Sequence, residues 1–416
     1  MTTSAQPAVY IAGIGMTPTG KFLDRSIKQL TAEAVTAALA DAGLTAGDIQ
    51  AAFYSNATQG VLEGQTMVRG QIALRDMGFE SIPIYNLENA CASASSAFNL
   101  AVQAVRAGEA EIALAIGAEK MFCADKAKMF SVFDGAWDVH QVDANKTALL
   151  QMGQGIEPPE GSTSKSPYSL FMDIYAAFGR FHMREFGTTQ RQFAAVASKN
   201  HGHSVHNPLA QYRTAYTVDE ILAAPPITYP LTLPMCAPIS DGAAAALVCS
   251  EAALARIAER RRAIRVLASV VATGATRRPE DISKHVTVKA SRLAYERAGV
   301  GPQDISLAEV HDATAIGEIV QTENLGFCEF GAGGPLAESG ATSIGGRIPV
   351  NTSGGLESKG HPIGATGLGQ LHELVSQLRG EAGSRQVQGA RLAIAENGGG
   401  LYGIEEAVCA ITILGR

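Results

Sequence analysis

TAEAVTAALADAGLTAGDIQAAFYS, residues 31–55, is matched further along the chain by TVKASRLAYERAGVGPQDISLAEVH, residues 287–311. Aligned without a gap, the two segments share an alanine-glycine pair, which ends at Gly43 and Gly299, and an aspartate-isoleucine pair shortly after it. Each pattern predicts an amphipathic helix, a glycine that ends the helix, a short loop and a strand. The same structural unit is therefore expected twice.

Two further pairs of similar segments follow in the same order. Residues 89–91, Asn-Ala-Cys, lead into a helical pattern, as do residues 351–355, Asn-Thr-Ser-Gly-Gly. Residues 114–119, LAIGAE, and residues 392–396, LAIAE, both read as apolar strands. Three matches in one order predict a gene-duplicated α/β fold made of two halves.

The composition limits the class of protein. The chain has 416 residues, of which 46% are hydrophobic, so it can bury a large core. Its net charge of −7 argues against nucleic acid as a partner. We expect no membrane span and no signal peptide, because long apolar runs and a basic, apolar N-terminus are absent. Six scattered cysteines without a C-x-x-C pair are typical of the reducing cytoplasm.

The two halves differ by a long insertion. We divide the chain into an N-terminal half (residues 1–121 plus 236–260), an insertion (122–235) and a C-terminal half (261–416). Long insertions on a rigid scaffold are commonly lids or binding loops, so the insertion is expected to cover the active site. Its histidines at 201, 203 and 206 have no neighbouring carboxylate or thiol, and we expect no metal site.

Cys91 is the first candidate catalytic residue. It lies in ENACASASSAF, residues 88–98, between an extended run and a helical pattern, and therefore close to a helix N-terminus. The helix dipole and free N–H groups there stabilise a thiolate and lower the thiol pKa. Cysteines in apolar runs are usually core residues, which we expect of the other five. Cys91 is predicted to be a nucleophile.

His361 is the second candidate. It lies between Gly360 and Pro362 in the glycine-rich segment 351–369, NTSGGLESKGHPIGATGLG, just before an amphipathic stretch. Glycine costs conformational entropy and packs poorly, so this density indicates a close approach of backbone. A histidine fixed at such a junction suits proton transfer or oxyanion binding.

Together these features resemble the thiolase superfamily. The resemblance rests on Cys91, the His311-Asp312 pair, the Gly360–Pro362 motif, the glycine run 398–400 and the Ser-Asp-Gly segment 240–242. It covers nearly the whole chain and is closest to sterol-carrier-protein-type thiolases and bacterial thiolase-like acyltransferases. It implies a duplicated thiolase fold with five layers, α/β/α/β/α. It also implies thioester chemistry with coenzyme A as a substrate and no bound cofactor.

The resemblance implies a role for each matching residue. Cys91 would accept the acyl group, His361 would take its proton and help to bind a thioester oxygen, and His311 would line the same oxyanion hole. Backbone N–H groups of Cys91 and of the glycine run would form a second oxyanion hole. The members of that run are Gly398, Gly399 and Gly400. Asn351, Ser353, Gly354 and Thr314 are the expected substrate contacts.

The chain departs from the family pattern where a second catalytic cysteine is expected. Sterol-carrier-type thiolases have His-Asp-Cys-Phe, whereas residues 311–314 read His-Asp-Ala-Thr. The Cys-x-Gly motif of other thiolases reads Glu-Asn-Gly at residues 396–398. Glu396 is our candidate for the missing acid and base. Alternatively it is a structural residue at a strand end, as Glu119 would be in the other half.

The resemblance favours a thiolase-type acyltransferase that cleaves a 3-oxoacyl-CoA with coenzyme A through an acyl-cysteine. The altered acid/base position suggests an aromatic, branched or dicarboxylic substrate. Three alternatives stay open: a biosynthetic condensing enzyme, a retro-aldol lyase acting on CoA esters, and a non-enzymatic lipid or acyl-CoA carrier. A homodimer is expected, together with a small zinc-ribbon/OB-fold partner subunit; neither nucleic acid nor a membrane is an expected partner.

Overall fold

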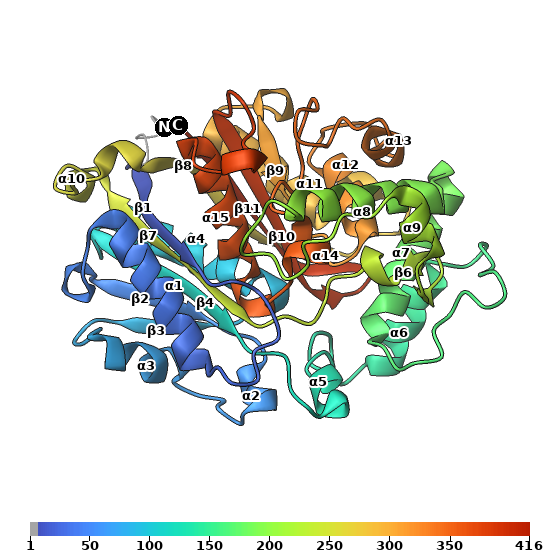
Figure 1. Cartoon of the computed structure of the whole chain (residues 1–416), viewed down its shortest axis with the longest axis horizontal. Coiled ribbons are helices and arrows are strands. Elements are labelled where there is room, and N and C mark those ends of the chain that lie inside the picture. The colour runs from blue at the N-terminus through green and yellow to red at the C-terminus, as the bar shows by residue number, and fades with distance from the viewer. Residues whose placement is uncertain (1–6) are drawn as a thin grey trace.

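The computed structural model describes residues 7–416, within which nine strands form one mixed sheet across the molecule (Figure 1). The strand order is β3-β2-β4-β7-β1-β8-β11-β10-β9. The strands are β1 (Val9–Met16), β2 (Ala51–Ser55), β3 (Ile84–Leu87), β4 (Ile112–Glu119), β7 (Gly242–Ser250), β8 (Ile264–Thr273), β9 (Leu307–Glu309), β10 (Leu392–Tyr402) and β11 (Glu405–Gly415).

The sheet has the internal symmetry that the repeated sequence predicts. β1 and β8 meet at its centre through the pairs Tyr10–Arg265 and Ile11–Ile264. Outward from this junction, β7, β4 and β2 on one side correspond to β11, β10 and β9 on the other. In the N-terminal half, β3 follows β2 at the edge of the sheet. In the C-terminal half, a parallel bridge between Ala308 and Val350 occupies the corresponding place beside β9. The duplication is therefore confirmed.

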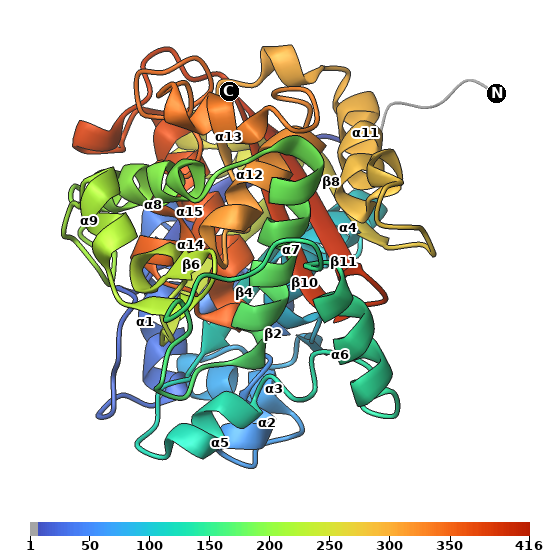
Figure 2. The same ribbon diagram turned by 90° about the vertical axis from the view of Figure 1, so that its right-hand side faces the viewer.

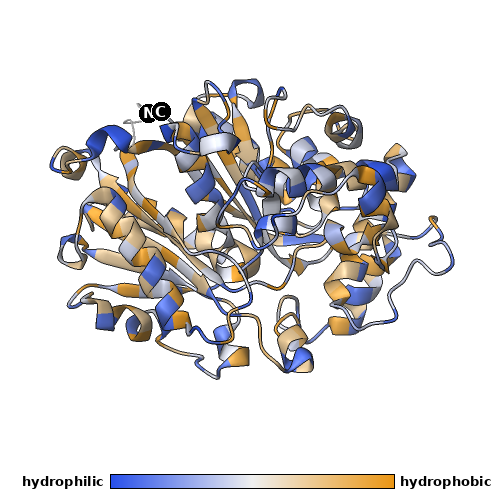
Figure 3. Cartoon of the chain, viewed as in Figure 1, coloured by the Kyte–Doolittle hydropathy of each residue, from blue (hydrophilic) through white to orange (hydrophobic). Residues whose placement is uncertain are grey.

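Helices form three layers around the two halves of the sheet. α4 (Ser93–Ala107) and α15 (Thr366–Arg379) share the central core, where Phe98 and Leu371 pack with strands from both halves. α1 (Ile27–Ala42) and α3 (Arg69–Leu74) cover the outer face of the N-terminal half. α11 (Val286–Ala298) covers that of the C-terminal half. The predicted five-layer fold is confirmed, and apolar residues follow its strands (Figure 3).

The ends of the two outer helices follow from their sequences. Ser26 and Gln29 form a capping box at the start of α1, each side chain accepting a hydrogen bond from the other's backbone N–H. Gly43 ends α1 with a φ of 66°, and Gly299 ends α11 with a φ of 69°. Both glycines adopt the left-handed conformation, as the sequence predicts.

Residues 122–235 form a helical region on one side of the molecule, at the right of Figure 1 and in front in Figure 2. It contains α5 (Lys126–Ser131), α6 (Val142–Gln151), α7 (Leu170–Phe186), α8 (Gln190–Ser204), α9 (Val218–Ala223), β5 (Pro226–Thr228) and β6 (Leu231–Thr232). The division of the chain at residues 121, 235 and 260 stays a prediction.

The remaining helices are short connections. They are α2 (Gln59–Leu62), α10 (Glu251–Leu254), α12 (Ala315–Asn324), α13 (Gly333–Glu338) and α14 (Gly355–Lys359). Among residues 7–416, none of the helices is long and apolar enough to cross a membrane.

Candidate active site

Cys91 lies in the tight turn that connects β3 to α4. Residues Ala90–Ala92 form a single 3-10 turn, and Ala90 adopts a positive φ of 48°. Strand β10 passes so close that a Cβ at Gly399 would lie 2.3 Å from the carbonyl oxygen of Asn89. Only glycine fits this approach, which brings the glycine run against the cysteine. Cys91 and Gly399 both line a cavity of about 480 Å³.

The ionisation of Cys91 differs from the sequence-based expectation. N–H groups of Cys91 and Gly400 donate hydrogen bonds to the sulfur and lower the thiol pKa. Burial outweighs them and raises the pKa of Cys91 to about 12, and Glu88 and Glu119 raise it further. The prediction of a lowered pKa is therefore wrong, because desolvation exceeds the stabilisation that the helix start provides. Cys91 is a neutral thiol at neutral pH.

Two imidazoles face the thiol. The Cys91 sulfur and one ring nitrogen each of His311 and His361 lie within 4.8 Å of one another. The Nε2 atoms of the two histidines are 3.5 Å apart. The structure thus brings together three predicted catalytic residues from three distant parts of the chain.

The loop around His361 fixes its tautomer. Its Nδ1 lies 2.7 Å from Oγ1 of Thr366, whose hydroxyl donates to the Pro362 carbonyl oxygen at 3.2 Å. Thr366 therefore accepts a hydrogen bond from Nδ1–H, which leaves Nε2 unprotonated. Nε2 is the atom that faces His311, so His361 presents a base to the cavity.

Both imidazoles are neutral at neutral pH. Burial lowers the pKa of His311 to about 4, although the Glu406 carboxylate opposes this shift. Burial, His311 and Lys359 hold the pKa of His361 well below its usual range. A neutral His361 can accept the Cys91 proton, whereas an imidazolium could not.

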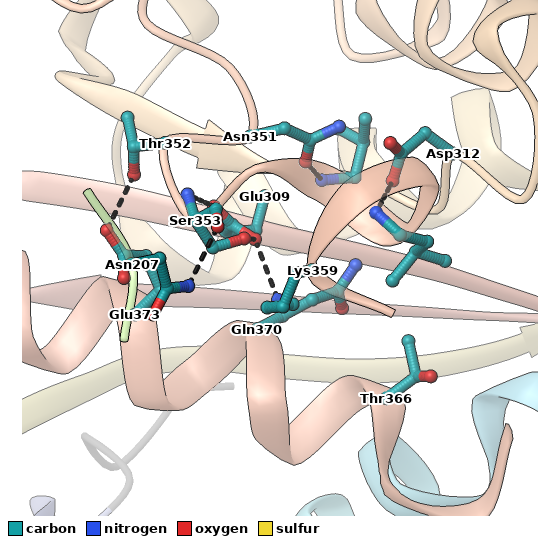
Figure 4. A network of polar contacts seen from close by, with 12 residues as sticks. Asn207, Glu309, Asp312, Asn351, Thr352, Ser353, Lys359, Thr366, Gln370 and Glu373 are labelled. Carbon is teal, nitrogen blue, oxygen red and sulfur yellow. Dashed lines mark hydrogen bonds and ion pairs between the residues drawn. The ribbon is translucent and has the colours of Figure 1, made fainter. Parts of the chain in front are cut away.

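Two of the four predicted substrate contacts, Asn351 and Ser353, lie in a buried polar network (Figure 4) and do not line the cavity. Asn351, at a positive φ of 55°, accepts a hydrogen bond from Val310 N–H at 2.9 Å and donates to Glu318 at 2.8 Å. Ser353 donates to Glu309 through its backbone N–H at 3.0 Å and its hydroxyl at 2.6 Å. These contacts fix the segment that carries His361.

Gly354 and Thr314 are also outside the cavity lining. A Cβ at Gly354 would lie 2.5 Å from Cβ of Ser204, so this glycine permits a close contact with α8. The buried Thr314 hydroxyl has no hydrogen-bond partner among the described residues. The residue before it, Ala313, does line the cavity.

Glu396 lies behind His311. Its carboxylate accepts a hydrogen bond from the His311 backbone N–H at 2.9 Å and contacts the Cys409 thiol at 3.8 Å. Burial and nearby acids raise its pKa well above the usual range. Glu396 is not among the residues that line the cavity, so its contacts fit a positioning role through His311.

Glu119 is the residue of the N-terminal half that corresponds to Glu396. Its replacement tests whether the buried carboxylate at this position holds the surrounding backbone in place. It accepts hydrogen bonds from the backbone N–H groups of Ala57, Thr58 and Gly364 at 2.9, 3.0 and 2.9 Å. Glu119→Ala leaves these buried donors unpaired, so we expect a loss of about 3 kcal/mol in the free energy of unfolding. Urea unfolding measures it. The exposed control Glu109→Ala should change stability by less than about 0.5 kcal/mol, and equal effects would contradict this role.

Two features of the cavity are not predicted from the sequence. The first is Glu406, whose carboxylate lies 3.2 Å from His285 Nε2 and whose pKa is lowered to about 2 by that contact despite burial. The second is a wall of aromatic residues supplied largely by the insertion. They are Phe122, Phe130, Phe133, Tyr168, Phe171, Tyr175 and Tyr212. Neither feature belongs to a recognisable sequence motif.

A duplicated α/β fold with a cysteine, two histidines and a glycine-lined cavity defines a thioester-handling enzyme of the acyltransferase class. Residues 9–218 match the thiolase N-terminal domain, and residues 268–415 match the thiolase C-terminal domain-like family. The chain belongs to the thiolase family, and the predicted resemblance is confirmed.

Several relatives are similar along nearly the whole chain. The acetyl-CoA acetyltransferase of Methanothermobacter thermautotrophicus is 37% identical over 95% of this chain and 97% of its own length. Human sterol carrier protein 2 is 37% identical over 94% of this chain and 69% of its own. The benzoylsuccinyl-CoA thiolase subunit BbsB of Thauera aromatica is 33% identical over 91% of both chains.

Two solved structures share the fold. The Ltp2-ChsH2(DUF35) aldolase is 25% identical, with a TM-score of 0.77 over 99% of both chains. Human mitochondrial 3-ketoacyl-CoA thiolase is 17% identical, with a TM-score of 0.68 over 99% of this chain and 100% of that one.

Proposed function

We propose that this thiolase cleaves a 3-oxoacyl-CoA with coenzyme A through an acyl-Cys91 intermediate. The observation that carries the proposal is the cluster of Cys91, His311 and His361 within 4.8 Å, at a cavity that Gly399 and Gly400 also line. A nucleophile, a neutral base and oxyanion donors are the groups that acyl transfer requires.

Each group has a defined step. His361 Nε2 takes the Cys91 proton as the sulfur attacks the C3 carbonyl of the substrate. The N–H groups of Cys91 and Gly400 point to the reacting sulfur and stabilise the acyl oxygen. His311, opposite His361, stabilises the enolate oxygen of the departing thioester. The coenzyme A thiol then attacks the acyl-cysteine and releases the shortened acyl-CoA.

The cavity favours an aromatic or branched acyl group over a dicarboxylic one. Aromatic side chains such as Phe133 and Phe171 form much of its wall, and Glu88 and Glu406 would repel a second carboxylate. Lys21 is the one lysine or arginine among the lining residues. The name of the Thauera relative indicates a CoA ester with both an aromatic ring and a second carboxylate, so it supports the aromatic part of this inference alone.

Intact-mass spectrometry tests the proposal directly. The pure protein is mixed with aromatic, branched, linear and dicarboxylic 3-oxoacyl-CoA esters without free coenzyme A. We expect a Cys91 adduct whose mass equals the acyl group, formed fastest with aromatic or branched esters and discharged by coenzyme A. Absence of an adduct with every ester, or preference for the dicarboxylic ester, would contradict the mechanism or the substrate class respectively.

A retro-aldol lyase is the second candidate, because one similar structure is an aldolase. Such an enzyme needs no nucleophilic thiol, so carbon–carbon cleavage that persists in Cys91→Ser would favour it. A condensing enzyme would use the same residues for the reverse reaction. The equilibrium constant for the physiological substrate decides whether the enzyme cleaves or condenses. The carrier alternative leaves the cysteine and both imidazoles without a role.

We also propose two kinds of partner. β3 is an edge strand of the sheet, and Tyr85 on it is 53% exposed, so a second copy could pair there to give the homodimer. The name of the similar aldolase includes a DUF35 component, which supports the small additional subunit expected from the sequence. Six free cysteines fit the cytoplasm as the location. Light scattering with and without a co-expressed partner measures both assemblies.

A further inference from the structure

The wall between the Cys91 cavity and a second cavity contains Tyr175, a side chain that has no role in the cleavage proposed above. Behind the Cys91 cavity lies a smaller one of about 80 Å³, lined in part by Phe178, Phe181 and Ile316. Tyr175, His311 and Glu406 line both cavities and are therefore neighbours in the wall between them. Tyr175 thus lies beside one of the two catalytic imidazoles.

The Tyr175 hydroxyl is available to a substrate. Its ring is fixed on α7 between Phe171 and Phe178, at centroid distances of 6.4 and 6.2 Å. The hydroxyl makes no hydrogen bond within residues 7–416, whereas Tyr168, which lines the same cavity, donates to Asp173 at 3.0 Å. The two tyrosines therefore differ in whether the hydroxyl is free.

Thiolytic cleavage requires protonation of the departing enolate on carbon, whereas His361 is placed at the Cys91 sulfur, so a separate group at the α-carbon is suited to supply that proton. Glu406 is ionised, since its pKa is about 2, and it cannot donate. The Cys236 thiol points to the carbonyl oxygen of Thr232 at 3.6 Å. Glu396 does not line the cavity. Within residues 7–416, Tyr175 and Tyr212 both line this cavity with hydroxyls that make no hydrogen bond, and of the two only Tyr175 shares the wall with His311.

We propose that the Tyr175 hydroxyl is the acid and base at the α-carbon of the substrate, an inference that rests on the proposed thiolytic function. As the C2–C3 bond breaks, its electron pair remains on the thioester fragment as an enolate. The phenol O–H bond breaks and a C2–H bond forms. The tyrosinate then takes a proton from the imidazolium of His361, which is the stronger acid. Neutral His361 next accepts the proton of the incoming coenzyme A thiol as the thiolate attacks the acyl-cysteine, and it returns that proton to the departing Cys91 sulfur.

The electrostatics of the partition agree with this role. The pKa of Tyr175 is raised well above its usual range, chiefly by burial. Negative charge on Cys91, Glu406 or Glu396 raises it further. The hydroxyl therefore stays protonated at neutral pH, ready to donate to an enolate carbon, which is a far stronger base. The imidazolium of His361, with its lowered pKa, is a stronger acid than the phenol, so return of a proton to the tyrosinate is favourable.

Hydrogen exchange on acetyl-CoA tests Tyr175 separately from acyl transfer. Wild-type protein in D2O is expected to place deuterium on the acetyl methyl group. Tyr175→Phe removes only the hydroxyl and should slow this exchange by at least about 100-fold. The control Tyr216→Phe, at a tyrosine that is 38% exposed and lines neither cavity, should stay within about threefold of the wild type. The second readout is transfer of labelled coenzyme A into acetyl-CoA, which requires Cys91 but no carbon acid, and Tyr175→Phe should retain it.

Three results would overturn the role of Tyr175. They are no deuterium incorporation by the wild type, equal incorporation by the two phenylalanine variants, and a parallel loss of both readouts in Tyr175→Phe. Failure of the proposed thiolysis looks different, because no labelled coenzyme A would then exchange in the wild type. The deuterium result decides the role of Tyr175 in either case.

Discussion

Replacing Cys91 by serine is expected to lower kcat/KM for thiolysis by at least about 1,000-fold. The cavity does not stabilise a free anion at this position, since burial raises the pKa of the thiol to about 12. A serine hydroxyl is a much weaker acid and nucleophile than a thiol, so the same environment disfavours its attack still more. The protein should also lose its acyl adduct by intact mass.

The control for Cys91→Ser is a cysteine outside the cavity. Cys328 is free and is not among the lining residues, so Cys328→Ser should keep activity within about threefold. Thermal unfolding of both variants should match the wild type within a few degrees. If Cys91→Ser retains thiolysis at the wild-type rate, the acyl-cysteine mechanism is excluded.

The fold was predictable because the duplication leaves a signal in local sequence. A helix, a glycine cap and a strand recur at residues 31–55 and 287–311, and each of these depends on nearby residues only. Gly43 and Gly299 end their helices in the same left-handed conformation. The repeat therefore predicts a duplicated α/β fold, whereas the order of the five layers came from the resemblance to thiolases.

The site was predictable only in part, because the catalytic residues lie in recognisable sequence motifs and the residues packed around them do not. Cys91, His311 and His361 meet as expected. The pKa of Cys91 could not be predicted, since it depends on desolvation by segments distant in sequence. Glu406 and Tyr175 have no motif and become visible only when β11 and α7 pack beside His311.

The polar residues near His361 show a related limit. Asn351 and Ser353 are expected substrate contacts only through the resemblance to thiolases. Their side chains instead satisfy buried backbone and carboxylate groups, and they hold the loop against β9 and α12. A sequence pattern shows that a loop is constrained without showing whether a ligand or the protein itself imposes the constraint.

Replacing His361 by asparagine is expected to lower kcat for thiolysis by about 1,000-fold, the range found for loss of a positioned general base. Asparagine keeps an N–H donor but cannot accept the Cys91 proton. The neutral thiol would then have to ionise in a buried site against a raised pKa. Rapid-quench measurement of acyl-enzyme formation should therefore show the loss in the acylation step, and unchanged acylation would assign another base.

The pH profile gives an independent test of the same residue. His361 acts as a neutral base, and its folded pKa is held well below 6.5 by burial, by His311 and by Lys359. As pH falls through 6.5 the base therefore stays unprotonated, and kcat/KM should decline only at lower pH. His311→Asn removes one cause of the lowered pKa, so it should move this decline toward 6.5. A decline centred at 6.5 in the wild type would show that another group limits the reaction.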